Sequence, residues 1–229
     1  MSLLQSLVDG VMIGGVYSII AVGLTLVFGV MGIVNFAHAE FMMIGMFVAY
    51  FFSAELGIDP LVGSIAAFSV AFGLGALFQF QLVSRVMNAP HTSQILLTVG
   101  LLIALESSAL LLFGPSFRSV KTSYQESAFN IGGIFVSMPY LAAFVLASLS
   151  AMILWLTLNR TWIGRAMRAT AENPMAAQLV GINVKAIYCI AFGLGTGLTA
   201  FGGAIVLPYT TVYPSVGSQY VILMFTVVV

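Results

Sequence analysis

Long stretches of this chain carry no charged side chain. There are 25 uncharged residues between Asp59 and Arg85, and 33 between Glu126 and Arg160. A further 44 uncharged residues follow Lys185. A helix needs about 20 apolar residues to cross the ~30 Å hydrocarbon core of a bilayer, because each residue advances it by ~1.5 Å. The pattern therefore predicts several membrane-spanning helices.

The composition excludes most other classes of protein. Apolar residues make up 61% of the 229 residues and charged residues only 6%, against about 25% in an ordinary soluble domain. Seven acidic and seven basic side chains give no net charge, so we expect neither a soluble enzyme nor a disordered chain nor a nucleic-acid-binding protein. The single Cys189 rules out a disulfide framework and favours no metal cluster.

We therefore predict an all-α fold, a polytopic transmembrane bundle with about six to seven spans that forms one domain over residues 1–229. The predicted spans are 10–33, 36–54, 61–83, 92–113, 138–158, 186–207 and a partial seventh from 218. The last apolar run is still in progress at Val229, so we expect the sequence to be a fragment.

The short loops indicate an orientation. Segment 159–185 holds four basic side chains against one acidic side chain, which predicts that it lies in the cytoplasm. Counting spans backwards also puts Arg85 inside and puts both the acidic 55–60 turn and the N-terminus outside. No Lys or Arg precedes Arg85, so no secretory signal peptide is expected. If the first span were a re-entrant pair, the N-terminus would lie inside.

Residues 117–137 are too polar to span a membrane. Within them, apolar side chains alternate on either side of Gly132-Gly133, at Phe129, Ile131, Ile134 and Val136. This pattern is typical of a small hairpin, and we expect a short extracytoplasmic cap, with a disordered loop as the alternative.

Small residues recur inside the predicted spans. Gly10 and Gly14 form a G-x-x-x-G step, and Gly193 and Gly197 form another. Because helices in lipid approach most closely where side chains are absent, these steps predict helix–helix contacts. The alternative is that the span 186–207 flexes or lines a pathway.

Neither of two common nucleotide-binding motifs is present in a usable form. Gly195-Thr-Gly-Leu-Thr-Ala200 matches G-x-G-x-x-G/A, yet no βαβ unit surrounds it and no acidic residue follows ~20 positions later. A phosphate-binding P-loop needs Gly-Lys, and neither Lys121 nor Lys185 follows a glycine. We therefore expect the chain to bind no cofactor, and any ATP-driven work to come from a partner.

Segment 159–185 predicts two short helices. One covers about 163–171 and places Arg165 and Arg168 on one face; the other lies between Asn173 as N-cap and Gly181 as its left-handed end, with Pro174 at its first position. Helices this short are marginal alone, so something must pack on them. The segment is either a surface loop on lipid phosphates or a docking element for a cytoplasmic protein.

Two stretches carry a resemblance to a known family. Ala176-Ala177-x-x-x-Gly181 resembles the E-A-A-x-x-x-G loop of ATP-binding-cassette (ABC) importer permeases, with Met175 where the family often has Glu. The fuller string from Ile163 to Asn183 is similar to the branched-chain amino-acid permease family of the Liv H type, which includes urea and short-amide permeases. Asn35-Phe-Ala-His-Ala-Glu40 is similar to that family's N-F-A-H-G-E, with Ala39 replacing a glycine.

The resemblance implies a permease subunit of the bacterial inner membrane that works by alternating access. Its implied partners are cytoplasmic ATPase subunits that hydrolyse ATP, a second related permease, an extracytoplasmic solute-binding protein and the lipid bilayer, with no nucleic acid. The residues implied in ATPase coupling are Arg165, Arg168, Glu172, Asn173, Pro174, Ala176, Ala177 and Gly181.

Polar residues inside the spans are candidates for a substrate pathway. Asn35 is a suitable N-cap for the second span, and Glu40 in its first turns is favoured by ~0.3–1 kcal/mol through the helix dipole. With His38, they form either a wetted interfacial cap or a helix start that meets solute.

Glu106 lies about 14 residues into its span, where a charge costs ~2.5–3.5 kcal/mol. It either faces a pathway or another helix, with Thr98, Ser107 and Ser108 as possible partners, or reaches the outer interface.

Rival functions remain open at this point. A urea or short-amide permease fits the low intramembrane charge equally well. A stand-alone channel or secondary carrier would need ion-coupling groups, for which Glu40 and Glu106 are the acidic candidates within spans. No nucleophile–base pair indicates an enzyme, because His38 and Glu40, two residues apart, face away from each other on a helix.

Overall fold

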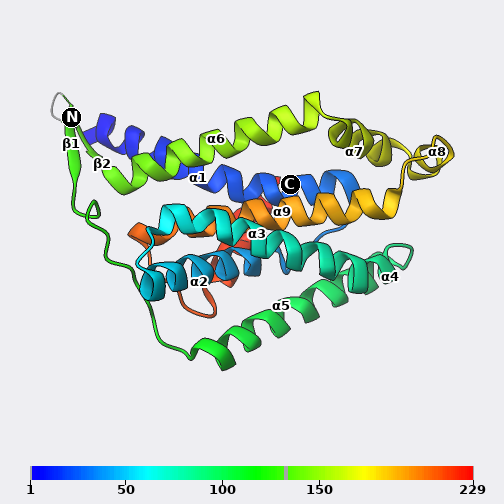
Figure 1. Cartoon of the computed structure of the whole chain (residues 1–229), viewed down its shortest axis with the longest axis horizontal. Coiled ribbons are helices and arrows are strands. Elements are labelled where there is room, and N and C mark those ends of the chain that lie inside the picture. Colours follow the sequence, from blue (N-terminus) through cyan, green and yellow to red (C-terminus); the bar gives the residue numbers. More distant parts are fainter. Residues whose placement is uncertain (1, 132–133, 229) are drawn as a thin grey trace.

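The computed structural model describes residues 2–131 and 134–228. It is a bundle of long helices with short elements at both ends (Figure 1). The long helices are α1 (Ser2–Met31), α2 (His38–Leu56), α3 (Pro60–Phe78), α5 (His91–Phe113), α6 (Met138–Arg160) and α9 (Val184–Val206). The short elements are the π-helix η1 (Gln79–Val83), α4 (Ser84–Val86), strands β1 (Ala128–Ile131) and β2 (Ile134–Ser137), α7 (Trp162–Glu172), α8 (Pro174–Leu179), the 3₁₀-helix η2 (Leu207–Tyr209) and α10 (Val216–Val228).

Six of the described helices are long and apolar enough to cross a membrane, which confirms the predicted polytopic helical bundle. The first helix begins at Ser2, eight residues before the predicted span, and is continuous to Met31. It is therefore not a re-entrant pair. The third span is longer than predicted, because α3 continues through η1 and α4 to Val86.

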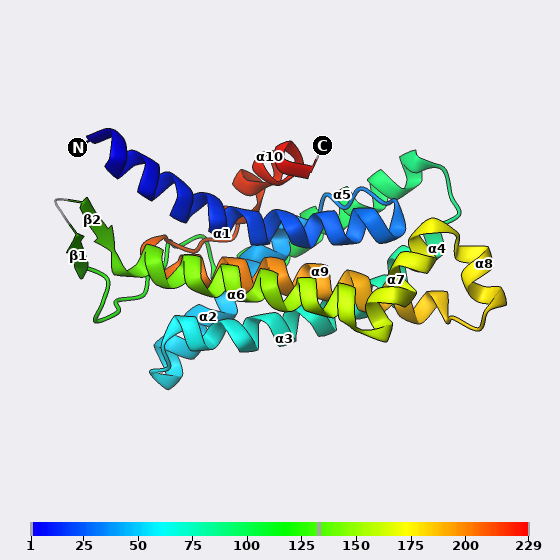
Figure 2. The same cartoon turned by 90° about the horizontal axis from the view of Figure 1, so that it is seen from above.

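The loops that were predicted to share a side of the membrane lie at the same end of the bundle. The N-terminus lies near β1 and β2 at one end, and α4, α7 and α8 lie at the other (Figures 1 and 2). The two strands pair antiparallel, with Ala128 opposite Ser137, as predicted; the Gly132-Gly133 turn lies outside the described residues. Gln5 ties α1 to β2 by donating to the Phe135 carbonyl at 2.7 Å.

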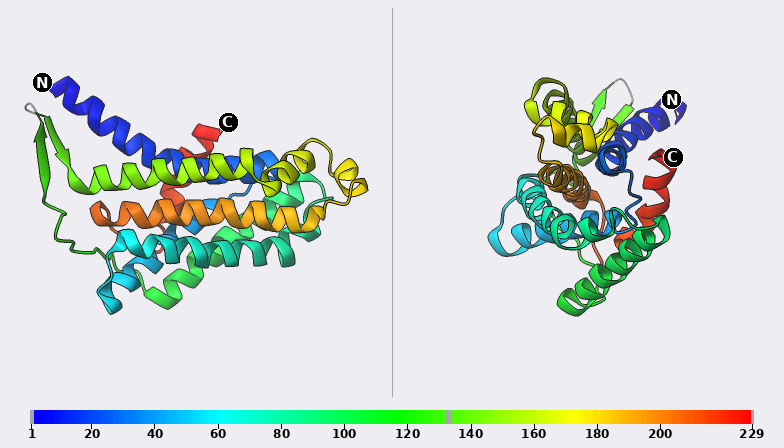
Figure 3. Two further views of the ribbon diagram at one scale, coloured as in Figure 1. Left: turned by 45° about the horizontal axis from the view of Figure 1, so that its top comes forward. Right: turned by 90° about the vertical axis from the view of Figure 1, so that its right-hand side faces the viewer.

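Helix α9 is the central helix of the bundle. It contacts α1, α2, α3 and α6, and in the left panel of Figure 3 it runs between α6 and α3. Glycines allow this close packing: a Cβ at Gly195 would lie 2.5 Å from the Gly23 carbonyl oxygen, and one at Gly197 would lie 3.0 Å from the Phe68 ring. In lipid, such packing stabilises helix association because hydrophobic burial contributes little.

One of the two predicted glycine steps contacts another helix within the described residues, and the other does not. Gly193 does contact a neighbouring helix, since a Cβ there would lie 2.9 Å from the Phe72 carbonyl oxygen. At Gly10 and Gly14, however, no atom of another described helix lies within 4 Å of the position that a Cβ would take, so that step faces open space. The G-x-x-x-G spacing alone does not say which face of a helix has a neighbour.

Replacing Gly45 by Ala tests the close packing of α2 on α9. A Cβ at Gly45 would overlap the backbone of Ala200, which cannot move aside as a flexible side chain would. We expect Gly45→Ala to cost about 1–3 kcal/mol and to lower the midpoint of thermal unfolding in detergent. Gly73→Ala is the matched control, because nothing lies within 4 Å of a Cβ there. Equal midpoints for the two variants would contradict the packing argument.

Candidate functional site

A cluster of buried polar side chains lies where α2 begins. After α1 ends, the chain turns at Gly32, which has φ of 65°, and α2 then starts inside the bundle, away from the end that carries α4 and α8 (Figure 1). Asn35, His38 and Glu40 are all at most 1% exposed. The interpretation of these residues as a wetted interfacial cap is therefore wrong for this chain, because protein covers all three.

A hydrogen bond joins this cluster to the central helix. His38 Nε2 lies 2.7 Å from Thr199 Oγ1 on α9. The Thr199 hydroxyl also lies 3.1 Å from the Gly195 carbonyl oxygen and 3.3 Å from that of Ile20 on α1. Three helices thus meet at one hydroxyl group. Nothing in the sequence pattern singles out Thr199, because only the packing shows which hydroxyl meets a histidine.

Most of the other polar atoms of the cluster have no partner. Among the described residues, Asn35 Nδ2, His38 Nδ1 and both Glu40 carboxyl oxygens are buried without a hydrogen bond. The predicted N-cap role of Asn35 is wrong: α2 has Ala37 at its N-cap position, and Asn35 Oδ1 instead accepts from the Ala37 N–H at 3.1 Å. Because unpartnered buried polar groups cost free energy, the cluster favours a polar guest.

Glu40 lies against the start of α10. A Cβ on Gly217 would be 2.7 Å from Glu40 Oε1 and 2.8 Å from Oε2, so only glycine leaves room for this carboxyl group. Gly217 lies in the first turn of α10, where backbone N–H groups give the helix end a partial positive charge. Nothing in the sequence pattern connects positions 40 and 217.

Glu106 approaches the same segment from α5. It is half-buried and lines a cavity of about 290 Å³ together with Phe117 and residues 213–215, which precede α10. Glu106 and Glu40 thus both approach the segment 213–217 that leads into α10. Two of the partners predicted for Glu106 are otherwise engaged: Thr98 donates to the Ile95 carbonyl at 3.1 Å, and Ser108 to that of Ala104 at 2.6 Å.

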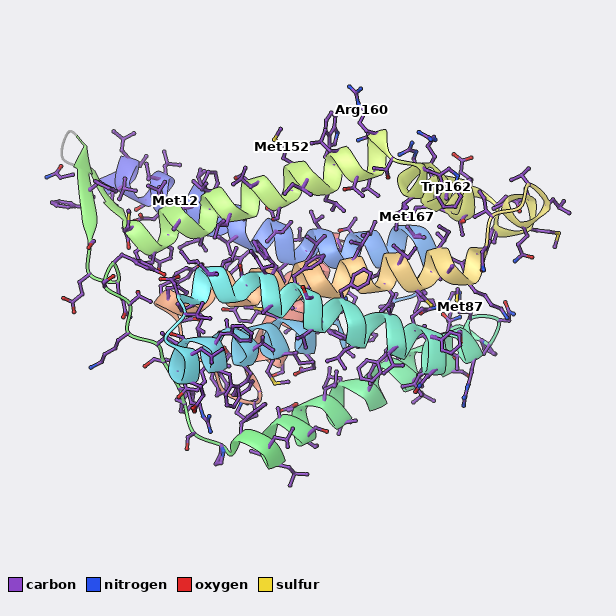
Figure 4. All side chains as sticks on the ribbon, in the orientation of Figure 1. Met12, Met87, Met152, Arg160, Trp162 and Met167 are labelled. Atoms are coloured by element: carbon purple, nitrogen blue, oxygen red, sulfur yellow. The ribbon has the colours of Figure 1, made fainter. Side chains whose placement is uncertain are left out.

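At the opposite end, α7 packs on the bundle through one face. Gly164, Met167 and Thr170 are buried, and Figure 4 shows Met167 on this helix beside the long helices. Arg165 and Arg168 are exposed, as the predicted amphipathic helix requires. Arg168 donates to the backbone carbonyl of Leu158, at the end of α6. Helix α7 is therefore attached to the spans rather than free in water.

Helix α8 has the predicted caps. Asn173 Oδ1 accepts from the Ala176 N–H at 3.0 Å, Pro174 is the first helical residue, and Gly181 has φ of 88°. The N–H of Ile182 bonds the Ala177 carbonyl at 3.0 Å, which is the Schellman form of helix end. The local structure of this segment is thus as predicted, while its coupling role stays a prediction.

The tip formed by α8 exposes large apolar side chains. Met175, Leu179 and Val180 are 75%, 85% and 77% exposed, and α8 lies at the extreme end of the molecule (Figure 1). Ala177 is the buried residue of this helix. Apolar side chains grouped at an exposed tip beyond the spans are typical of a protein-binding surface.

Comparison with known proteins identifies the family. Residues 6–229 match the family described as branched-chain amino acid transport system, permease component. The chain is 30% identical to the high-affinity branched-chain amino acid transport system permease protein BraD of Pseudomonas aeruginosa and 28% identical to LivH of Escherichia coli, in each case over 99% of this chain and 78% of the relative. It is also 31% identical to the nucleoside ABC transporter permease protein NupC of Lactococcus lactis, over 76% of this chain and 58% of that protein. No solved structure gave a significant match.

The chain therefore belongs to this permease family, as the resemblance of its motifs predicted. Together with the six candidate membrane helices, the relatives indicate a multi-pass protein of the inner membrane. These relatives are transport permeases and not enzymes.

Thr199→Val tests the hydrogen bond that joins the three helices. Valine keeps the shape of threonine and removes its hydroxyl, leaving His38 Nε2 buried without a partner. We expect a loss of stability of about 1–3 kcal/mol, measured as a lower thermal midpoint in detergent. The control is Thr25→Val, because Thr25 is an exposed residue and its hydroxyl donates to the Ala21 carbonyl of its own helix at 2.9 Å. Equal thermal midpoints for Thr199→Val and Thr25→Val would show that the hydrogen bond between Thr199 and His38 does not stabilise the fold.

Proposed function

We propose that this chain is the membrane-spanning permease subunit of an ABC importer for branched-chain amino acids, working by alternating access. The relatives that carry this function in their names align with nearly the whole chain. The structural observation that carries the proposal is α8, a capped helix that presents Met175, Leu179 and Val180 to water at the far end of the bundle.

Helix α8 is the contact for a cytoplasmic ATPase subunit in this proposal. It is joined to α9 by a short turn in which Asn183 caps α9, accepting from the Ala186 N–H at 3.1 Å. It follows α7 directly, and α7 is packed on α1, α6 and α9. A displacement of α8 therefore reaches the spans through short, capped connections. The coupling residues are Arg165, Arg168, Glu172, Asn173, Pro174, Ala176, Ala177 and Gly181.

The remaining partners are those that membership of this permease family implies. No P-loop is present in the sequence, so ATP is hydrolysed by the partner ATPase and the permease binds no cofactor itself. A second related permease completes the transmembrane path, and an extracytoplasmic binding protein delivers the solute. The apolar spans hold the chain in the lipid bilayer.

The buried polar cluster is the proposed solute pathway. Asn35, His38 and Glu40, with Glu106 beside the same segment before α10, offer hydrogen-bonding groups in an otherwise apolar interior. Binding has to be weak enough for release, and a few unpartnered groups meet that need better than a dense lining of charges. A zwitterionic amino acid supplies both donors and acceptors for them.

Reconstitution tests the proposed function and its rivals together. The chain, assembled with its permease partner and ATPases in lipid vesicles, should take up leucine delivered by the binding protein only when ATP is hydrolysed. Urea or a short amide, offered in the same assay, distinguishes the amide alternative. Leucine uptake driven by an ion gradient without ATP would instead establish a secondary carrier and overturn the proposal.

Gly181→Val tests the coupling role of α8. At φ of 88° a β-branched residue is strained, so the helix end should rearrange and its contact with the ATPase should be lost. We expect ATP-driven uptake to fall at least about tenfold while membrane insertion is unchanged.

The matched control is Gly181→Asn, because asparagine tolerates the left-handed conformation. It should retain most of the transport, measured in the same vesicles. Normal transport by the Val variant would contradict a docking role for α8.

A further inference from the structure

A second cavity lies between the spans and the coupling segment. Its volume is about 380 Å³, within the range of small-molecule sites. One wall comes from η1 and the residues after it, including Gln79, Phe80 and Met87; the other comes from α8 and α9, including Gln178 and Lys185. Figure 4 shows Met87 at the end of the bundle that carries α7 and α8. The cavity therefore opens on the predicted cytoplasmic side, away from the His38 cluster.

The two walls offer complementary polar groups. Lys185 is exposed and supplies a cationic donor on one side. On the other side, Gln79 is 1% exposed, and its Oε1 has no hydrogen-bond partner in the described part of the chain. The Gln79 amide nitrogen contacts only the Met87 sulfur, at 3.5 Å, which is a weak acceptor.

The lining also includes apolar side chains on both sides. Phe80 and Met87 lie on one wall and Val184 on the other, among polar residues that include Ser84, Asn88 and Gln178. Gln79 is also the first residue of the π-helix η1. Helices of this form are rare and occur frequently at functional sites. A matching ligand carries an anionic group for Lys185, a hydrogen-bond donor for Gln79 Oε1 and an apolar body between them.

We propose that this cavity binds a zwitterionic amino acid with an apolar side chain from the cytoplasm, and that its occupation slows transport. The carboxylate pairs with Lys185, the ammonium group donates to Gln79 Oε1 after the amide turns into the cavity, and the side chain packs on Phe80 and Met87. Because Gln178 and Pro174 of α8 line the same cavity, a bound ligand holds the coupling segment against η1. The inference rests on the proposed function, since the ligand is the transported solute.

The chain contains its own reporter for this site. Cys189 is the single cysteine of the sequence, is partly exposed and lines the cavity. In the assembled complex, L-leucine at ten times its dissociation constant should slow labelling of Cys189 by N-ethylmaleimide about tenfold. Leucinamide, which lacks the carboxylate, and 4-methylpentanoate, which lacks the ammonium group, should give little protection.

Variants separate the site from nonspecific protection. Lys185→Ala and Gln79→Leu should abolish protection by leucine. The matched controls are Lys121→Ala, in the outer segment, and Gln81→Leu, an exposed residue of the same π-helix that does not line the cavity; both should keep it. Lys185 is exposed, so its replacement leaves the core unchanged and the test remains decisive if the Gln79 variant does not fold.

The regulatory consequence has its own measurement. Leucine loaded into the vesicle lumen, on the α8 side, should slow ATP-driven uptake by the native chain. The slowing should be several-fold weaker for Lys185→Ala. For each chain, uptake into loaded vesicles is compared with uptake by the same chain into empty vesicles. Undiminished protection in Lys185→Ala, equal protection by leucinamide, or a Cys189 that fails to react without ligand would each overturn the inference. ATP-driven uptake without these effects would leave the proposed function standing, so the two fail separately.

Discussion

The close contact of α9 with the backbones of α1, α2 and α3 is the constraint on which the rest of the structure depends. A Cβ on either Gly23 or Gly195 would lie 2.5 Å from the carbonyl oxygen of the other, and Gly45 lies against the backbone of Ala200. At this separation, dispersion and short polar contacts stabilise the bundle without help from hydrophobic burial, which is weak between helices in lipid. The same separation brings Thr199 within 2.7 Å of His38. The polar cluster therefore depends on the glycines around it, which lack side chains and let the helices come this close.

The cost of that cluster is consistent with a transport role. A chain that only needed to remain in a membrane could place apolar residues at 35, 38 and 40, since unpartnered buried polar atoms are unfavourable. Instead, the helix start that carries them lies in the interior, next to Gly217. Sites of this kind, in which a span begins inside the bundle, provide polar groups at membrane depth without exposing the backbone to lipid.

Sequence reasoning succeeded where the physical signal is local. Uninterrupted apolar runs predicted six to seven spanning helices, because the bilayer fixes the length of each. Six of the described helices are long and apolar enough to span, and α10 in the partial seventh is shorter. The caps at Asn173 and Gly181 were also predictable, since each depends on the backbone of its own turn. It failed at Asn35, which looks like an N-cap in the sequence although the helix starts three residues later. Gly10 and Gly14 have the spacing of a contact and, in the described chain, no neighbour.

The residues that no local pattern revealed are those that link separate helices. Three residues matter because of what lies opposite them: Thr199 and Gly217 face α2, and Gln79 faces the far wall of the cavity between η1 and α8. Helix α9 connects both regions: Thr199 lies along it, and Lys185 lies in its first turn, directly after the segment that carries α8. In the proposed mechanism, a displacement of α8 reaches His38 along α9, because both regions contact this one helix. A ligand that holds the two walls of the cavity together would oppose that displacement at its origin.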